Sequence, residues 1–314
     1  MAQMSKQKKK EYMQNKTQDM KDRWFNAIAD GIQSGEIPWR KPWKGGTGSM
    51  PANLKSKKTY RGGNLVGLWF SGIAHGFSDL RFATRNQLKD AGLSIEGLKN
   101  GTGFPIRFFK PNKYEITNDE GEIEVRNGYV ARFYEVWCVE QCKDYEAPVS
   151  DSHQVVPEHE MMKNFNTYVE SQPTLTLERG GNQAFYRFNG DTIKLPKHED
   201  FTDSLGEVMT AFHEAVHSTG HPKRVERPLS SKFGSPEYAF EELIAELGSM
   251  LTVVRLGGEF RPDAVMEENS NSIAYLQHWL NACKNQDSAL TKAFALAQES
   301  SDFIVSHALG EAVE

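Results

Sequence analysis

Hydrophobic residues recur at helical spacing in several parts of this chain, most clearly around residues 205–219. There the apolar side chains repeat every three or four positions, as on the buried face of a helix: Leu205, Val208, Met209, Phe212 and Val216. Because Gly220 and Pro222 are typical of helix ends, we expect this helix to stop about one turn beyond His217. A second helix is predicted to begin at Pro236, with Ser235 as its N-cap.

Alternating apolar and polar positions predict strands elsewhere. Residues 104–109 and 130–139 are expected to pair, with the acidic stretch 117–128 as their loop. Residues 183–196 are predicted to form a second hairpin that turns at Asn189-Gly190. Further elements are expected as a strand leading into a short helix at 81–89, a helix followed by a strand at 158–178, and helices at 11–34, 64–70, 271–280 and 288–306. Arg61-Gly62-Gly63-Asn64 is predicted to be a turn.

The order of these elements predicts an α+β protein with two domains, for which 314 residues are sufficient. A polar segment without periodicity, containing Pro148 and Pro157, separates the two halves. We therefore expect a basic N-terminal tail at 1–20, a first domain at 21–145, a linker at 146–157 and a second domain at 158–314.

Charge divides the chain in the same way. Residues 1–149 carry 24 Lys and Arg against 17 Asp and Glu, a net charge of +7, whereas residues 150–314 carry 13 against 25, a net charge of −12. Such a division suggests that the first half binds an anionic partner and that the second half has a different function. Three scattered cysteines argue against a disulfide framework and favour a reducing cytosol. No apolar run reaches membrane-spanning length, and no apolar segment typical of a signal peptide follows the basic N-terminus.

Two clusters in the first half combine aromatic and basic residues. Aromatic rings that stack on bases, next to side chains that neutralise phosphates, are typical of proteins that bind single-stranded nucleic acid. The candidate DNA-binding residues are Trp39, Arg40, Lys41, Trp43, Lys58, Tyr60, Arg61 and Asn64. The alternative is that one or both tryptophans fill the hydrophobic core.

The strongest chemical signal is His213-Glu214-Ala215-Val216-His217. Two histidines four residues apart on a helix share one face, so their rings can bind one metal ion. A catalytic zinc takes three protein ligands and keeps a fourth position for water, whose pKa it lowers. Glu214 is then placed to act as the general base, which makes it the predicted catalytic residue.

The third metal ligand is expected to be a carboxylate on the following helix. Glu242-Leu243-Ile244-Ala245-Glu246 resembles the E-x-x-A-[DNE] pattern of gluzincin metallopeptidases. That resemblance implies that Glu242 binds zinc and that Glu246 orients a ligand histidine from outside the metal shell. Glu246 and His221 are weaker candidates for the third ligand, and Glu241 is expected to be solvated. Tyr238 and His221 are expected at the rim of the site, where either could donate to an oxyanion.

Taken together, the motifs of both halves resemble those of the ArdC antirestriction family of plasmids and phages. The resemblance rests on residues 37–43, 51–53, 60–64, 191–196, 213–221 and 241–246, together with Thr84, Gln87 and Tyr238. It implies an N-terminal domain that binds single-stranded DNA and a C-terminal zincin-like metallopeptidase domain. It also implies that the protein shields incoming DNA from host restriction, in the cytoplasm of the cell that carries or receives the mobile element.

Three functions fit these observations. The first is a protein that protects DNA by coating single strands. The second is a metalloprotease, recruited to single-stranded DNA, whose substrate is a DNA-bound or crosslinked host protein. The third is a DNA-binding protein in which zinc is purely structural, although structural zinc sites usually have four protein ligands. We expect the first two in combination, with Zn²⁺ as the metal and Mn²⁺ or Co²⁺ as alternatives.

Overall fold

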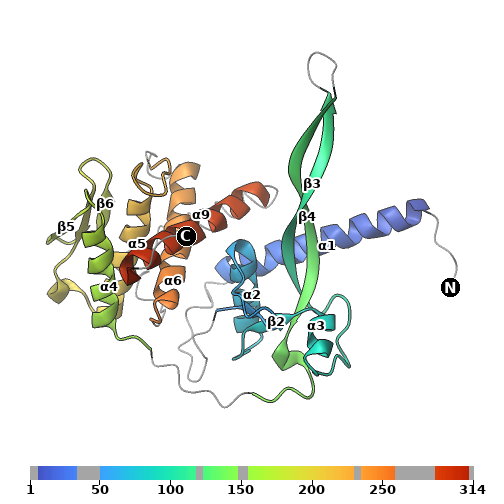
Figure 1. Ribbon diagram of the computed structural model, residues 1–314. Helices are drawn as coiled ribbons and strands as arrows, with labels where there is room; N and C mark the ends of the chain where they lie inside the picture. The colour runs from blue at the N-terminus through green and yellow to red at the C-terminus, as the bar shows by residue number, and fades with distance from the viewer. Residues whose placement is uncertain are drawn as a thin grey trace. The chain divides into compact units, whose positions relative to one another are not determined.

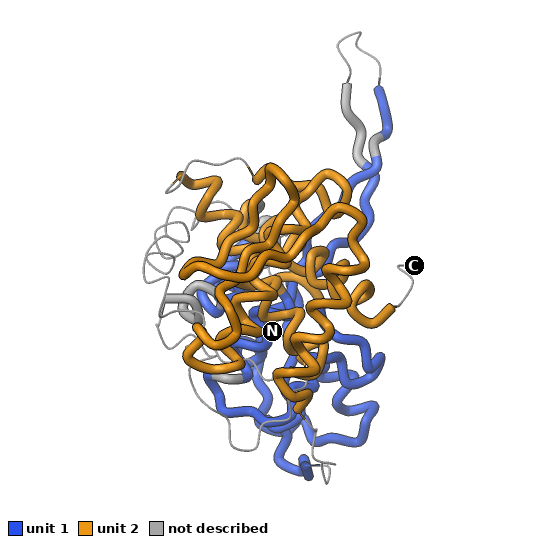
Figure 2. Tube along the Cα trace, turned by 90° about the vertical axis from the view of Figure 1, so that its left-hand side faces the viewer, with its two compact units in different colours: residues 1–30, 51–60, 64–147 blue, residues 31–50, 61–63, 148–314 orange. Residues whose placement is uncertain are grey.

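The computed structural model describes residues 6–33, 50–117, 123–147, 155–229, 235–258 and 287–310. The chain divides into two compact units, coloured separately in Figure 2. The first contains residues 1–30, 51–60 and 64–147, and the second contains residues 31–50, 61–63 and 148–314. Helices and sheets occur in both, which confirms the predicted two-domain α+β class. The domain limits that we expected from the linker remain a prediction.

The first unit is built on a four-stranded sheet (Figure 1). The elements in this part of the chain are α1 (Lys6–Gln33), β1 (Ala52–Asn53), α2 (Gly62–Ala74), β2 (Arg81–Ala83), α3 (Arg85–Asp90), β3 (Phe104–Thr117), β4 (Ile123–Cys138) and the 3-10 helix η2 (Val139–Gln141). The strand order is β1-β2-β4-β3, with β1 parallel to β2 and the other pairs antiparallel.

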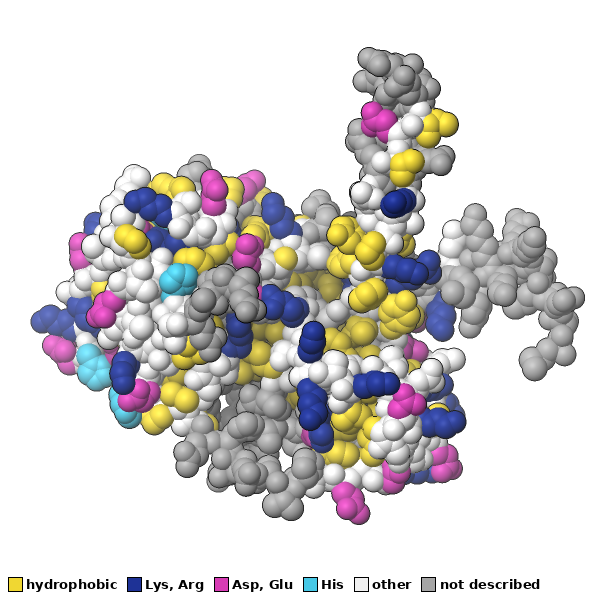
Figure 3. All heavy atoms as spheres, viewed as in Figure 1, with side chains coloured by type: hydrophobic (Ala, Val, Ile, Leu, Met, Phe, Trp, Pro, Cys, Tyr) yellow, Lys and Arg dark blue, Asp and Glu magenta, His cyan; other side chains and the backbone are white. Residues whose placement is uncertain are grey.

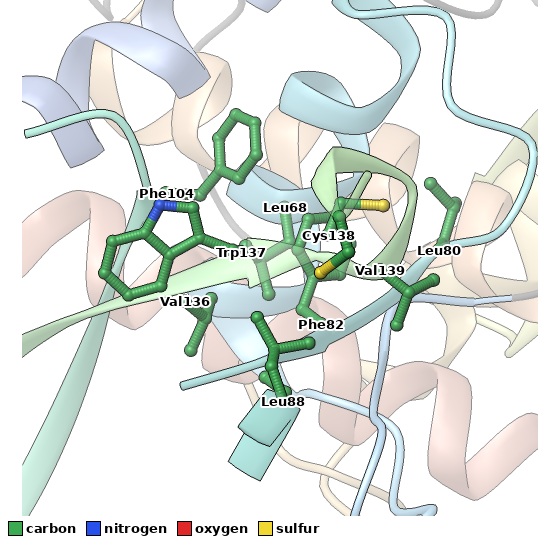
Figure 4. Packing of buried hydrophobic residues seen from close by; sticks show 11 residues of the cluster. Leu68, Leu80, Phe82, Leu88, Phe104, Val136, Trp137, Cys138 and Val139 are labelled. Carbon is green, nitrogen blue, oxygen red and sulfur yellow. The ribbon is translucent and has the colours of Figure 1, made fainter. Parts of the chain in front are cut away.

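The core of this unit lies where β2 and the inner ends of β3 and β4 meet α2 and α3. Its buried side chains are grouped in Figure 4 and include Leu68, Phe82, Leu88, Phe104, Val136 and Trp137. Helix α1 adds Trp24, whose ring meets Phe133 edge-on at 6.5 Å between centroids. Beside it, Arg23 forms an ion pair of 2.9 Å with Glu135 of β4. The apolar stripe of α1 thereby packs against the inner part of the long hairpin.

The second unit combines helices with a small sheet. Its elements are α4 (Glu158–Ser171), β5 (Thr176–Arg179), β6 (Phe185–Arg187), β7 (Thr192–Leu195), the 3-10 helix η3 (His198–Asp200), α5 (Ser204–Thr219), α6 (Pro236–Arg255) and α9 (Asp287–Leu309). The strand order is β5-β7-β6, with β7 parallel to β5 and antiparallel to β6. The hairpin that we predicted around Asn189-Gly190 is therefore confirmed.

Helix α5 is packed among α4, α6 and α9. Phe212 of α5 meets Phe165 of α4 edge-on at 5.9 Å, and both rings are fully buried. Gly248 lets α6 approach α5 closely, because a Cβ at this position would lie 2.9 Å from the side chain of Val216. This close approach brings the carboxylates of α6 to the histidine face of α5. Within the described residues, no helix is long and apolar enough to cross a membrane.

Four expectations about elements need correction or lie outside the described residues. Helix α1 begins at Lys6, before the start of the helix expected at 11–34, and the basic tail at 1–20 remains a prediction. The predicted turn at 61–64 is instead the start of α2. Strands β3 and β4 extend through most of the expected loop at 117–128, since β-branched residues such as Ile123 and Val125 support pairing despite the acidic neighbours. The helix expected at 271–280 lies outside the described part of the chain.

Candidate metal centre

The site is carried by α5, whose sequence favours a helix with one deeply buried face. Asp203 caps its N-terminus by accepting a hydrogen bond of 2.8 Å from the backbone of Gly206. The apolar positions that we assigned to the core are all buried. His213 and His217 lie one turn apart on the same face, and the exposed fractions of their side chains are 7% and 14%. The helix therefore holds two imidazoles side by side with little access to water.

Three donor atoms converge at this face. The Nε2 atoms of His213 and His217 lie 3.1 Å apart. The carboxylate of Glu242 on α6 reaches both rings, with one oxygen 3.5 Å from Nε2 of His213 and the other 3.6 Å from Nε2 of His217. Two ligands of a tetrahedral zinc, each about 2.0–2.1 Å from the metal, are about 3.3 Å apart. The spacing of these three donors therefore fits a single metal ion.

The electrostatics of Glu242 suit a metal ligand. Burial by itself would raise its pKa, but a hydrogen bond from His213, the charges of both histidines and a hydrogen bond from Tyr238 lower the pKa to about 2. Helix α6 holds this side chain in place through its start, where Ser235 accepts a hydrogen bond from the backbone of Tyr238 and Pro236 occupies the first turn. Glu242 is thus an ionised carboxylate at neutral pH.

Each histidine has a second carboxylate on the side away from the donor cluster. Glu246 lies 3.4 Å from Nδ1 of His213, although the two groups are not aligned well enough for a hydrogen bond. Glu241 lies 3.2 Å from Nδ1 of His217 and forms a hydrogen bond with it. A partner at Nδ1 fixes the ring orientation and leaves Nε2 available for a metal. Both rings are therefore turned so that Nε2 faces Glu242.

The expectation that Glu241 is solvated is wrong. Its side chain is 9% exposed and accepts two hydrogen bonds from Arg227, of 2.7 and 3.0 Å. Burial would raise the pKa of Glu241, but the hydrogen bonds from His217 and Arg227 lower it. A signal for this role was present in the sequence, since Glu241 stands at helical spacing from Ile244, Ala245 and Gly248 on the buried stripe of α6.

Glu214 is buried beside the donor cluster, with 7% of its surface exposed. Burial raises its pKa, against the opposing charges of His213 and His217 and a hydrogen bond from the backbone of Tyr186 on β6. The carboxylate is therefore able to hold a proton at a pH where exposed glutamates have lost theirs. The hydrogen bond between the Tyr186 backbone and Glu214 also shows that β6 lies against the histidine face of α5.

The two residues expected at the rim lie in different places. Tyr238 stands one turn before Glu242 and hydrogen-bonds to its carboxylate. His221 follows the end of α5, where its ring stacks at a tilt on Phe188 at 5.6 Å and its Nδ1 accepts a hydrogen bond from the backbone of Lys223. His221 is not part of the three-residue donor cluster.

The structure describes four of the eight predicted DNA-binding residues. Lys58 is exposed, whereas Tyr60 is half-buried and accepts a hydrogen bond of 3.2 Å from Asn53. Asn64 pairs through its side-chain amide with the backbone N–H and C=O of Arg107, at 2.7 Å each. Arg61 is exposed and forms an ion pair with Asp302. The remaining four, Trp39, Arg40, Lys41 and Trp43, lie outside the described residues.

Two protein-family models match the chain. The N-terminal domain of the anti-restriction factor ArdC matches residues 18–137, and a zincin-like metallopeptidase family matches residues 164–296. The second match contains the whole donor cluster. The two matches fall on either side of the predicted linker.

Relatives of known sequence include an uncharacterized protein, y4eC, of Sinorhizobium fredii (strain NBRC 101917 / NGR234). It is 29% identical over 294 residues, which cover 91% of each chain. A DNA primase TraC of Escherichia coli is 29% identical over 291 residues, covering 88% of this chain but 19% of the primase. The chain thus spans about a fifth of that relative's length.

Two solved structures resemble most of the chain. Both are crystal structures of the antirestriction ArdC protein from the R388 plasmid, at 27% identity. The metal-free structure aligns with a TM-score of 0.69 and covers 92% of this chain and 98% of the other. The Mn(II)-bound structure aligns with a TM-score of 0.66 and covers 90% and 97%.

Proposed function

Because this chain belongs to the ArdC-like family, with an ArdC-type N-terminal domain followed by a zincin-like metallopeptidase domain, we propose that it is an antirestriction protein that binds single-stranded DNA and carries a zinc peptidase site. It would protect the DNA of an incoming mobile element from host defence, in the cytoplasm of the cell that carries or receives that element. The observation that carries the peptidase half is the convergence of His213, His217 and Glu242 next to Glu214.

In this proposal His213, His217 and Glu242 hold the metal. Two imidazoles and one carboxylate form a donor set that is typical of catalytic zinc, and Mn²⁺ or Co²⁺ is compatible with the same donors. Glu246 faces the other ring nitrogen of His213, which supports an orienting role for it rather than a ligand role. Glu241 orients His217 in the same way. When bound, such a metal polarises a carbonyl and lowers the pKa of water.

Glu214 is proposed as the general base. Its buried carboxylate, with a raised pKa, can take the proton from the attacking water and return it to the departing amine of a peptide. Tyr238 is placed beside Glu242, close enough to the donors to provide a hydroxyl group for the developing oxyanion. His221, held against Phe188, is the second candidate for that role.

The DNA-binding half rests on the ArdC-type domain and on the positive charge of residues 1–149. Lys58 is exposed and able to reach phosphates, and Arg61 is exposed but would have to exchange its ion pair with Asp302 for a phosphate. Tyr60 and Asn64 have internal hydrogen bonds that favour a supporting role. Trp39, Arg40, Lys41 and Trp43 remain proposed contacts. A protein brought to single strands in this way would meet other proteins bound to the same DNA, and Glu214 beside the donor cluster favours their cleavage as a second activity.

The test compares the wild type with Glu214→Gln. Cleavage of casein and of the protein itself would be followed with and without an oligothymidine of about 20 nucleotides. We expect DNA-dependent cleavage by the wild type, no cleavage by the variant, and equal metal content and DNA affinity in both. Cleavage retained by Glu214→Gln would remove this residue from the mechanism. Absence of cleavage by the wild type, with tight DNA binding, would leave a DNA-protecting protein with a silent or highly selective peptidase domain.

A further inference from the structure

Strands β3 and β4 form a two-stranded ribbon that extends away from the body of the first unit (Figure 1). They pair with each other over the full register from Phe104↔Val136 to Thr117↔Ile123. Strand β2 joins β4 only at Trp137 and Cys138, the last residues of β4. Within the described residues, the outer part of the ribbon therefore has no third strand in its sheet.

Large apolar side chains are exposed along this ribbon, where an isolated hairpin would be expected to carry polar ones. Eleven large hydrophobic side chains are exposed among the described residues, and seven of them lie on the ribbon: Phe108, Phe109, Ile123, Val125, Tyr129, Val130 and Tyr134. The exposed fraction reaches 55% at Phe108 and 73% at Tyr129. A group of exposed rings of this kind marks an interaction surface.

The rings occupy both faces of the ribbon. Residues that pair across the strands share a face, so Phe108 and Arg132 lie on one face. Lys110, two positions after Phe108 on β3, and Tyr134, two positions after Arg132 on β4, lie on the same face. The rings of Phe108 and Tyr134 meet edge-on at 6.4 Å. The other face carries Phe109, Tyr129 and Lys113, and the guanidinium of Arg107 lies 4.7 Å from the ring centre of Phe109. Each face thus alternates rings with cations.

Charge along the ribbon is strongly segregated. The segments 105–113 and 126–134 contain no acidic residue and five basic ones: Arg107, Lys110, Lys113, Arg126 and Arg132. Five of the six acidic residues in the range 104–138 lie in the stretch 115–124 that joins these segments, and the sixth, Glu135, is paired with Arg23. Dark-blue basic side chains and yellow hydrophobic ones are visible together on the ribbon in Figure 3. The inner part of the ribbon, defined by these two segments, therefore suits an anionic partner that also offers flat apolar surfaces.

We propose that the inner part of the ribbon binds single-stranded DNA on both faces. Phe108 and Tyr134 on one face and Tyr129 on the other would stack on bases, while Lys110 and Arg132 on the first face and Lys113 on the second meet phosphates. Unpaired bases present π-faces to aromatic side chains, and the phosphates beside them present the negative charge that the cations require. In a duplex the bases stack on one another, so exposed rings gain little from it. A second copy of the inner part, placed against the first, would bring five positive charges against five.

This inference rests on the proposed DNA-binding function and assigns it residues other than the candidates in the range 39–64. Its test uses the full chain and two variants. The ring variant combines Phe108→Ala, Tyr129→Ala and Tyr134→Ala, and the charge variant combines Lys110→Gln, Lys113→Gln and Arg132→Gln. All six side chains are exposed, so the fold should tolerate their replacement. Matched controls in the second unit are Phe185→Ala with Phe188→Ala, and Lys163→Gln with Lys197→Gln and Lys223→Gln.

The measurement is fluorescence anisotropy with a labelled 20-nucleotide oligothymidine and with a duplex of equal length, between 50 and 200 mM salt. Loss of three stacked rings should weaken single-strand binding at least about tenfold, because stacking of bases on aromatic rings is a main source of affinity for single strands. Loss of three cations should make the slope of log affinity against log salt shallower by about 2. The control variants should bind like the wild type, and circular dichroism should show that every variant is folded.

Two results would overturn the inference. One is single-strand affinity and salt dependence that are unchanged in both ribbon variants while the wild type binds well. The other is a wild-type dimer that the ring variant dissociates without any loss of DNA affinity, which would assign the ribbon to a second copy of the chain. A wild type that does not bind single strands at all would instead refute the proposed function, so the two failures are distinguishable.

Discussion

Arg227 and Glu241 form a buried, two-pronged ion pair directly behind His217 of the candidate metal centre. Nε of Arg227 donates to one carboxylate oxygen at 3.0 Å and Nη2 donates to the other at 2.7 Å. The remaining guanidinium N–H groups donate to Thr219, Ser300 and the backbone of Val216, so all five have acceptors. The same carboxylate hydrogen-bonds to His217. The pair therefore links the orientation of a proposed ligand to the packing of α5, α6 and α9.

Replacing Glu241 by Gln should destabilise the protein and weaken metal binding together. Removing one partner of a buried ion pair leaves Arg227 without compensation, which typically costs about 3–5 kcal/mol. Loss of the Nδ1 partner of His217 should reduce metal affinity roughly 10- to 100-fold. Urea unfolding of the metal-free protein and calorimetric zinc titration would measure the two effects. Glu170→Gln, an exposed acid on α4, is the control, and equal behaviour of both variants would show that the ion pair is unimportant.

Replacing Glu242 by Ala should remove the metal, whereas Glu246→Ala should only weaken its binding. Glu242 faces Nε2 of both histidines, but Glu246 approaches the far nitrogen of His213. Loss of an orienting group typically lowers metal affinity about 10- to 100-fold, and loss of a ligand should exceed that. Metal content after dialysis, measured by mass spectrometry, would compare the two. Full occupancy in Glu242→Ala would transfer the ligand role to another residue.

Metal binding should strengthen as pH rises. In the metal-free protein burial opposes protonation of His213, but its hydrogen bond to Glu242 and the charge of Glu246 prevail and raise its pKa to about 10. A metal must displace that proton, so apparent affinity should increase about tenfold per pH unit below 10. Calorimetry in two buffers of different ionisation enthalpy would count the released protons. Proton release near zero at pH 7 would contradict the raised pKa.

The same group links stability to pH in the metal-free protein. Because the folded-state pKa of His213 lies above the unfolded value of about 6.5, its stabilising effect is complete below pH 6.5 and disappears as pH rises through 10. We therefore expect the thermal midpoint of the metal-free protein to fall between pH 7 and 10. The zinc-loaded protein should lack this decline, and a parallel decline in both forms would assign the effect to other groups.

Asp191 should contribute to a separate loss of stability in acid. Burial would raise its pKa, but hydrogen bonds from Arg224, Thr174 and Tyr186 lower it to about 2. The resulting stabilisation, on the order of 2 kcal/mol, is present above pH 4 and is lost as pH falls through 2. Asp191→Asn is a suitable variant, because this residue has a φ of 47° and Asn tolerates the left-handed region. Its urea midpoint should vary less than that of the wild type between pH 4 and 2.

The sequence by itself determined the local features of this protein. Helical spacing placed His213 and His217 on one face of α5, and a cap and a proline located the start of α6 with Glu242 on it. The charge difference between the halves and the turn at Asn189-Gly190 were equally visible. These properties depend on residues close together in the chain, so periodicity and turn chemistry are sufficient to predict them.

Tertiary structure decided the rest. Glu241 and Glu242 are adjacent and point about 100° apart on α6. Which of them faces the Nε2 atoms, and which one meets Arg227 and His217, depends on how α6 is rotated against α5. The exposure of the β3–β4 ribbon also follows from the absence of a third strand beside its outer part among the described residues, although its apolar alternation resembles that of a buried strand. The partners of a side chain across an interface are set by packing between distant segments, and local sequence patterns do not carry that information.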